Sequence, residues 1–267
     1  RDRSVSRGLG DVYKRQHMTT ERVKVEQNTQ KFSFKELISE IAHNKALIGI
    51  IVCALLFLLA QLSLSNMNNY IYPNYFGNVS AMSLANLAGM VVILVLSTFI
   101  VKLSAKVGKK ELSVIGSIIS AAAFLILFFI HTDNVWVWIV LVLISSVGTA
   151  MFNMVIWAMI TDVIDDSEVR TGVRQDGTIY SVYSFARKLG QACSSGISGV
   201  LLSIIGYTAA TAHDPKVVDG IYNVTCLVPA LGMILLFLAL QFLYPLNKKR
   251  VEENAKILKE RREAKVQ

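Results

Sequence analysis

The sequence predicts an all-α integral membrane protein built as a bundle of six transmembrane helices. Of its 267 residues, 53% are hydrophobic and only 17% are charged, and the mean hydropathy is +0.49. One soluble core could not bury so much apolar surface, so lipid must act as the solvent. Crossing a hydrocarbon layer of about 30 Å takes roughly 20 mostly apolar residues. Six stretches meet this requirement: residues 46–65, 84–103, 112–130, 135–160, 179–205 and 221–244.

The segments that flank the spans are short and carry no recognisable catalytic module. Residues 1–16 lack the apolar core and cleavage site of a signal peptide; they look like translated adaptor sequence, so we expect the chain to be truncated upstream. Residues 17–45 are expected to form a cytoplasmic linker, in which apolar residues at helical spacing over 31–45 predict a short amphipathic helix. The charged, helix-prone tail, residues 246–267, is expected to be a solvated cytoplasmic end.

The net charge of +8 follows the loops between spans. Basic residues gather between spans two and three, between spans four and five, and after span six, whereas the opposite loops contain a single lysine. The positive-inside rule therefore predicts that both chain ends lie in the cytoplasm, with the chain in the cell (inner) membrane. Aromatic residues are not interleaved with the basic ones, so the expected partner is membrane lipid and not nucleic acid.

The cysteines and histidines predict neither a disulfide nor a metal site. Cys53, Cys193 and Cys226 each fall inside an expected span, where a thiol acts as a small apolar filler. The four histidines are scattered without the paired spacing of metal ligands. An enzyme would need a nucleophile, metal ligands or a paired acid and base, and only Lys188 is an ionisable candidate deep in a span, so no catalytic residue is expected.

The clearest functional pattern is a polar stripe on the fifth span. Its members recur every three or four residues and so share one helix face; they are Ser181, Ser184, Lys188, Gln191, Ser195 and Ser198. At about 1.5 Å per residue, Lys188 lies some 13 Å from the cytoplasmic end of the span, where a lysine costs roughly 2.5 to 3.5 kcal/mol. The alternative is that Lys188 snorkels to the interface. Arg187 points about 100 degrees away from Lys188 around the helix. It could be a site residue, the partner of a carboxylate, or a group that snorkels to the interface.

Polar faces on two other spans favour a sugar ligand. The fourth span places on one side Ser146, Thr149, Asn153 and Trp157. Such a face offers hydrogen bonds to hydroxyls and an indole for the C–H face of a sugar. The end of the first span places on one face Gln61, Ser65, Asn69 and Tyr72. Alternatives stay open, because small polar residues also pack helices together and the second group suits the wet end of a span.

The most specific segment, residues 160–191, is expected to be the loop between spans four and five and the start of span five. It reads ITDVIDDSEVRTGVRQDGTIYSVYSFARKLGQ. In order it contains Asp162 and Asp165, Glu168, a Thr171-Gly172-x-Arg174 turn, Asp176-Gly177, Tyr180-Ser181 and Lys188. This ordered run resembles the signature of the glycoside-pentoside-hexuronide:cation symporter family, the melibiose permease-like symporters. The resemblance extends more loosely from about Phe32 to the tail.

The resemblance implies the major facilitator fold, in which two six-helix bundles face each other around a central substrate site. This chain would be the C-terminal half of a 12-helix transporter, with the N-terminal bundle as its partner. It would move a small sugar, a glycoside, pentoside or hexuronide, together with Na⁺ or H⁺ by alternating access and without another cofactor. Lys188 would face the central cavity. Asn153 stands where some members carry an aromatic residue, so the class of sugar stays open.

The coupling ion is expected to bind mainly in the N-terminal bundle. The paired acidic residues on which the family's coupling depends lie there, and none of the six spans here shows such a pair. Charged residues of the expected loop are predicted to form a cytoplasmic ion-pair network that closes one gate: Asp162, Asp165, Glu168, Arg170 and Arg174. The alternative is a solvated loop, in which such pairs contribute little.

A second function class is a self-contained six-span channel or membrane scaffold. It predicts a genuine start codon near Met18. The symporter predicts six further spans upstream, with acidic residues inside them.

Overall fold

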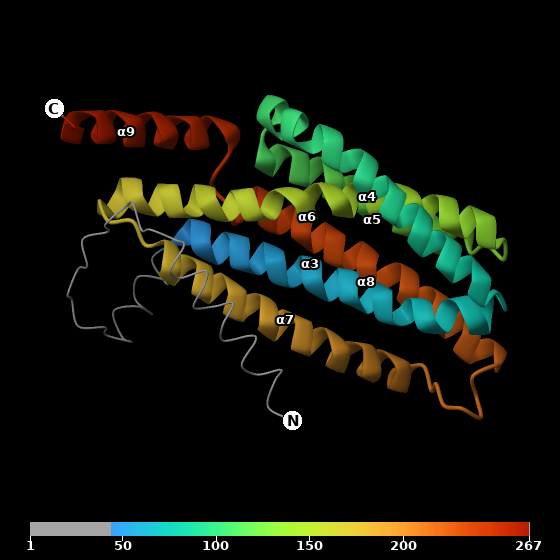
Figure 1. Ribbon diagram of the computed structural model, residues 1–267. Helices are drawn as coiled ribbons and strands as arrows, with labels where there is room; N and C mark the ends of the chain where they lie inside the picture. The colour runs from blue at the N-terminus through green and yellow to red at the C-terminus, as the bar shows by residue number, and fades with distance from the viewer. Residues whose placement is uncertain (1–43, 267) are drawn as a thin grey trace, which may run out of the picture. The chain divides into compact units, whose positions relative to one another are not determined.

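The computed structural model describes residues 44–266, and every regular element within them is helical (Figure 1). The expected all-α class is therefore confirmed. The elements are α3 (Lys45–Tyr70), the π-helical turn η1 (Ile71–Tyr75), α4 (Val79–Val107), α5 (Lys109–Ile130), α6 (Val135–Thr171), α7 (Asp176–Ile204), α8 (Pro215–Phe242) and α9 (Lys248–Val266). The adaptor-like segment expected at 1–16 and the amphipathic helix expected at 31–45 lie outside or at the edge of the described residues.

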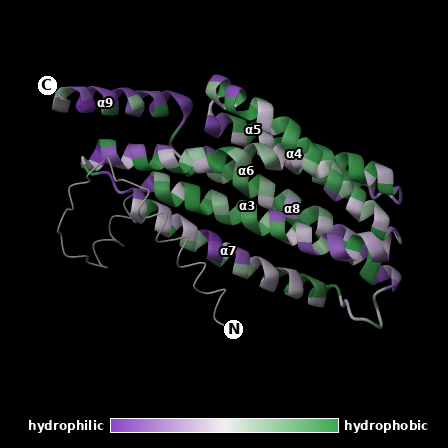
Figure 2. Ribbon diagram, viewed as in Figure 1, coloured by the Kyte–Doolittle hydropathy of each residue, from purple (hydrophilic) through white to green (hydrophobic). Residues whose placement is uncertain are grey.

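Six helices, α3 to α8, occupy the six expected spans. Five of them are long and apolar enough to cross a membrane, counting η1 with α3. The remaining helix, α7, has 29 residues, but its polar stripe and its two adjacent cations make it less apolar. Figure 2 shows hydrophilic residues near the middle of α7, whereas the nearby helix α3 is mostly hydrophobic. Five of the six helices begin before the expected stretch, whereas α7 and α8 end one and two residues short of its expected end. The largest difference is in α6, which continues from the expected end at residue 160 to Thr171.

Asparagine side chains begin three of these helices. Asn44, Asn78 and Asn134 precede α3, α4 and α6, and their side-chain oxygens accept N–H groups of the first turn at 3.0, 3.0 and 2.9 Å. These bonds satisfy donors that a helix start leaves without partners. Gly172 then closes α6 with φ +75, a left-handed conformation that glycine adopts without strain.

A proline shapes the end of the first span. Pro73 has no N–H and cannot continue the regular hydrogen-bond ladder. The chain widens there into η1, and the N–H of Phe76 reaches back to the carbonyl of Ile71 at 3.2 Å. The resulting turn carries Tyr72, which is buried.

The helices pack in a consistent order. α5 lies between α6 and α8, α3 lies between α8 and α7, and α4 runs along α6 (Figure 1). One core cluster surrounds Phe57, Phe152 and Tyr244, and a second surrounds Trp138 and Tyr222. α4 contributes little to either, and apolar side chains along it are exposed, among them Leu87 at 62% and Val101 at 71%. Such a surface is expected where lipid or another membrane helix is the neighbour.

Two glycines allow a close crossing between α5 and α6. A Cβ built on Gly116 would lie 2.5 Å from the carbonyl oxygen of Gly148, and one built on Gly148 would clash with the carbonyl oxygen of Gly116. Next to this contact, the hydroxyls of Ser120 and Ser145 share a buried hydrogen bond of 2.6 Å. Small residues at both positions let the backbones approach, as is common between membrane helices.

We expect Gly116→Ala to destabilise the bundle by roughly 1 to 3 kcal/mol, because the two helices must move apart. The matched control is Gly196→Ala, since a Cβ there meets no heavy atom within 4 Å. Both changes gain the same helix propensity of about 1 kcal/mol. Thermal unfolding in detergent should show a lower midpoint for Gly116→Ala alone; equal midpoints for the two variants would mean that Gly116 does not set the distance between these helices.

The charged tail forms α9, and one of its faces docks on the end of α6. Buried Asp166 accepts hydrogen bonds from Asn254 Nδ2 at 3.1 Å and from Arg250 Nε at 3.4 Å, and it pairs with Arg170 Nε at 3.1 Å. Leu258, one turn after Asn254 on α9, is also buried. The expectation of a helix-prone tail is confirmed, but the tail is solvated on only part of its surface, because Asp166 needs partners when it leaves water.

Candidate functional site

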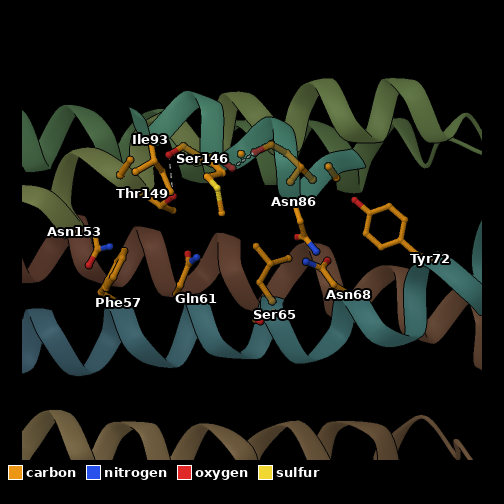
Figure 3. A pocket seen from close by; sticks show the side chains of 16 residues that line it. Phe57, Gln61, Ser65, Asn68, Tyr72, Asn86, Ile93, Ser146, Thr149 and Asn153 are labelled. Atoms are coloured by element: carbon orange, nitrogen blue, oxygen red, sulfur yellow. Dashed lines mark hydrogen bonds between the residues drawn. The ribbon is translucent and has the colours of Figure 1, made fainter. Parts of the chain in front are cut away.

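A cavity of about 330 Å³ opens between α3, α4 and α6. Its size falls within the usual range of small-molecule sites, about 300 to 1,000 Å³. Half of the lining is polar, and Figure 3 shows these side chains converging from the three helices. The polar residues are Gln61, Ser65, Asn68, Tyr72, Asn86, Ser146, Thr149 and Asn153.

Two lining residues of α3 carry acceptors without donors. Gln61 Oε1 and Asn68 Oδ1 are buried and have no hydrogen-bond partner within the described part of the chain. Leaving such a group unpaired costs about 1 to 3 kcal/mol. The amide ends of Asn68 and Asn86 face each other across the opening (Figure 3). The cavity therefore offers acceptors to a ligand that brings hydroxyl or amine donors.

The structure brings six of the predicted polar residues together here: Gln61, Ser65, Tyr72, Ser146, Thr149 and Asn153. Asn69 does not line the cavity; it is exposed, and its amide donates to the carbonyls of Ser65 and Asn66 on its own helix. At about 100 degrees per residue, Asn68 lies near the mean direction of Gln61 and Tyr72, whereas Asn69 deviates by about 70 degrees. This geometry favours Asn68 over Asn69 from spacing alone.

Asn68 and Asn86 are therefore the residues that sequence analysis missed. Asn86 is an amide near the start of a mostly apolar span, and a polar side chain there needs a reason. That signal was available in the sequence.

Trp157 does not line the cavity but lies one helical turn from Asn153, which does. The indole stacks on Tyr180, with ring centroids 5.8 Å apart and planes at 28°. It meets Tyr183 edge-on, also at 5.8 Å. Arg187 Cζ lies 4.9 Å from the indole centroid. Arg187, the neighbour of Lys188 in sequence, is thus the cation of α7 that faces α6.

The remaining predicted residues of the α7 stripe lie outside this cavity. Ser184 and Gln191 are half-buried, and Lys188 is exposed. Lys188 makes no hydrogen bond or ion pair with the described residues. Farther along, Ser198 is buried and accepts a hydrogen bond from Asn66 Nδ2 of α3 at 3.0 Å. Within the stripe, Ser198 alone is buried, whereas Ser181 and Ser195 are exposed like Lys188. The role of Lys188 in a central cavity stays a prediction.

The acidic residues after position 160 were expected in a loop, and this expectation is wrong. Asp162, Asp165 and Glu168 lie on the last turns of α6, since the helix ends only at Gly172. Charges there can leave the bilayer while the helix continues, so apolar patterning marks the span and not the end of the helix. The connection to α7 is reduced to residues 172–175.

Arg174 links both sides of this short connection. Its Nη1 lies 2.9 Å from Asp165 Oδ1 and 2.8 Å from Glu168 Oε2, and its Nε lies 2.7 Å from Asp176 Oδ2. Burial tends to lower the pKa of Arg174, but its hydrogen bonds to Glu168, Asp176 and Asp165 outweigh that effect and hold the pKa above its ordinary value.

The other two predicted gate residues have different partners. Asp162 pairs with Lys109 Nζ of α5 at 2.6 Å and not with an arginine. Arg170 pairs with Asp166, which the prediction did not include. An ion-pair network is therefore present at this end of the bundle, and its action as a gate stays a prediction. Residues 44–266 contain no group of three His, Cys, Asp or Glu side chains that could hold a metal ion.

The sequence matches the family described as MFS/sugar transport protein over residues 12–248. The chain belongs to this family. The resemblance to the glycoside-pentoside-hexuronide symporters agrees with the match, as does the all-helical bundle. The apolar helices and the family together make this chain a multi-pass membrane protein.

Several transporters are similar to it. The chain is 32% identical over 218 residues to the uncharacterized symporter YjmB of Bacillus subtilis, covering 82% of this chain and 47% of the relative. It is 36% identical over 149 residues to the glucuronide carrier protein homolog of Escherichia coli, 56% of this chain and 32% of the relative. It is 25% identical over 249 residues to the isoprimeverose transporter of Lactiplantibacillus pentosus, 89% of this chain and 52% of the relative. The chain thus spans about half or less of the length of these relatives.

Proposed function

We propose that this chain is the C-terminal bundle of a secondary active transporter that carries a small sugar together with Na⁺ or H⁺ by alternating access. The observation that carries the proposal is the cavity between α3, α4 and α6. Its amide acceptors lack donors, and sugar hydroxyls supply donors in number. Two relatives are named for carrying a glucuronide and isoprimeverose, which supports a sugar as the cargo here.

The bundle would act with a partner bundle of six further helices, and the coupling cation would bind mainly there. The exposed faces of α4 and α7 support this arrangement. α4 exposes apolar side chains along its length, and α7 exposes Lys188, a cation that needs an acidic or polar neighbour in the membrane. A carboxylate pair in the partner bundle would satisfy that lysine and also bind the cation.

The charged end of the bundle is proposed to face the cytoplasm, with the protein in the inner membrane. Three basic segments meet at this end. Lys110 Nζ donates to the carbonyl of Tyr244 at 2.7 Å, Lys248 Nζ to that of Lys106 at 2.9 Å, and Arg261 Nη2 to that of Val169 at 3.0 Å. Such clustering supports the orientation that the positive-inside rule predicts.

Counterflow in proteoliposomes tests the proposal. Proteoliposomes that contain the full-length protein and are loaded with an unlabelled sugar should accumulate the same sugar in labelled form. Imposed Na⁺ or H⁺ gradients should also drive uptake of the sugar. A panel of hexoses, pentoses, glycosides and hexuronides, with Na⁺, Li⁺ and pH varied, identifies cargo and ion. No counterflow with any sugar would refute the proposed function.

A matched pair of variants ties the activity to the cavity. Gln61→Leu keeps a side chain of similar size but removes a hydrogen-bond acceptor from the cavity lining. We expect sugar affinity to fall by about tenfold, because one lost hydrogen bond costs about 1 to 1.5 kcal/mol. Gln241→Leu makes the same change at an exposed position on α8 outside the cavity and should leave affinity unchanged. Equal losses for both variants would place the sugar elsewhere.

A further inference from the structure

We infer that Arg187, held over the ring of Trp157, recognises the carboxylate of an acidic sugar, so that the carrier selects sugar acids over neutral sugars. This inference rests on the proposed transport of a sugar and adds the chemical class of the cargo. It assigns a specificity-determining role to an arginine outside the polar stripe of α7.

Arg187 differs from the other described arginines in what it binds. Every other arginine in residues 44–266 binds a carboxylate or a backbone carbonyl: Arg170, Arg174, Arg250, Arg261 and Arg262. Arg187 has no carboxylate within ion-pair distance in that part of the chain. Its one hydrogen bond, from Nη1 to Tyr183 Oη, is long at 3.5 Å. A guanidinium has five N–H donors, so most of them are left for another molecule.

Aromatic rings hold the guanidinium of Arg187 in place. Its Cζ lies 4.9 Å from the centroid of Trp157 and 5.9 Å from that of Tyr183. A guanidinium interacts with rings through its flat face, and its edge stays free for two parallel hydrogen bonds to a carboxylate. A positioned arginine loses less conformational freedom on binding such a group than a mobile lysine does.

The cluster of Arg187 and its rings lies beside the cavity. Trp157 follows Asn153 on α6 by about one turn, roughly 6 Å along the helix axis, and both residues are exposed on the same side of the helix. Trp157 is 43% exposed and its stacking partner Tyr180 is 47% exposed. The exposed parts of these two rings provide an apolar surface one turn of α6 from Asn153. One sugar acid can therefore place hydroxyls near Asn153, its C–H face on a ring, and its carboxylate at Arg187.

Two alternative roles for Arg187 would have different effects on transport. Arg187 could simply connect α7 to α6, because α7 packs mainly on α3, or it could pair with a carboxylate of the partner bundle. Either role would affect every cargo equally. Recognition of the cargo affects only a cargo that bears the acid.

The test compares glycosides that differ only in the acid. Methyl β-glucuronide and methyl β-glucoside form one pair, and the corresponding galacturonide and galactoside form another. The full-length protein in proteoliposomes is assayed for counterflow of each at pH 7, where the carboxylates are ionised. The variants are Arg187→Gln and Arg187→Lys, with Lys102→Gln as the control, since it removes a cation from an exposed site on α4.

We expect the wild-type protein to prefer an acidic glycoside. Arg187→Gln should reduce kcat/KM for it by about tenfold to a hundredfold, as expected for losing hydrogen bonds to a charged group. Transport of the neutral partner and the thermal unfolding midpoint should stay near wild type. Arg187→Lys should keep part of the preference, and Lys102→Gln all of it.

Several results would overturn the inference. Equal losses for acidic and neutral glycosides would assign Arg187 to packing or to the partner bundle, and no loss would remove it from recognition. If the wild-type protein transports only neutral glycosides, the inference of an acidic cargo is wrong while the proposed sugar transport stands. If the wild-type protein carries no sugar of either kind, the proposed function fails and the inference fails with it.

Discussion

Replacing Lys188 with leucine in the full-length protein is expected to reduce active sugar accumulation by more than about tenfold while membrane insertion stays near normal. A lysine inside a span costs roughly 2.5 to 3.5 kcal/mol on insertion scales, so leucine should insert at least as well. Lys188 is exposed on α7 and has no hydrogen-bond or ion-pair partner within residues 44–266. We expect its ammonium to pair with carboxylates of the partner bundle and to compete there with the coupling cation.

The measurement is accumulation of labelled sugar in cells and vesicles, together with the amount of protein in the membrane. Lys102→Leu is the control, because it removes an exposed lysine near the end of α4; accumulation should stay near wild type. Normal transport by Lys188→Leu with unchanged ion dependence would mean that the lysine reaches the interface and that the proposed cation coupling does not involve it.

Arg174→Gln should slow transport by about tenfold without reducing insertion. The arginine holds Asp165 and Glu168 of α6 and Asp176 of α7 within 2.9 Å, and so it fixes the short turn that orients α7. Such a contact sets the balance between conformations, and a shift of about 1.4 kcal/mol in that balance changes a population tenfold.

Transport rates in vesicles and protein amounts in the membrane test this prediction. The control, Lys249→Gln, removes a cation whose contact with Glu253 on α9 is 4.0 Å long and exposed, so it should have no effect. Asp162→Asn is expected to impair transport as well, by freeing Lys109. If both Arg174→Gln and Asp162→Asn transport and express like the wild type, the pairs are ordinary surface contacts.

The fold could be predicted because hydropathy dominates in a membrane. A stretch of about 20 apolar residues has few alternatives to a helix once lipid surrounds it. Each of the six predicted stretches forms a helix in the structure. The same reasoning could not place the end of α6. Residues 161–171 are polar but still helical, so hydropathy marked where the apolar stretch ends and missed where the helix ends.

The candidate site was partly predictable, for a similar reason. Helical spacing grouped Gln61 with Tyr72 and Thr149 with Asn153, because each pair lies on one helix. That the two groups share one cavity depends on the crossing of α3 and α6, which spacing along a chain does not report. The pairing of Asp162 with Lys109 joins residues of α6 and α5, and the sequence suggested only local partners.

The sequence by itself determined that this chain is a multi-pass membrane protein, which stretches form its six long helices, and which family it belongs to, since all three depend on composition and on an ordered local motif. Only the tertiary structure decided that α3 and α6 share one cavity, that α9 docks on Asp166, and that Arg187 faces Trp157 while Lys188 is exposed. Adjacent residues on a helix point about 100 degrees apart, so the small rotation that packing imposes on each helix selects which of two neighbours reaches the site.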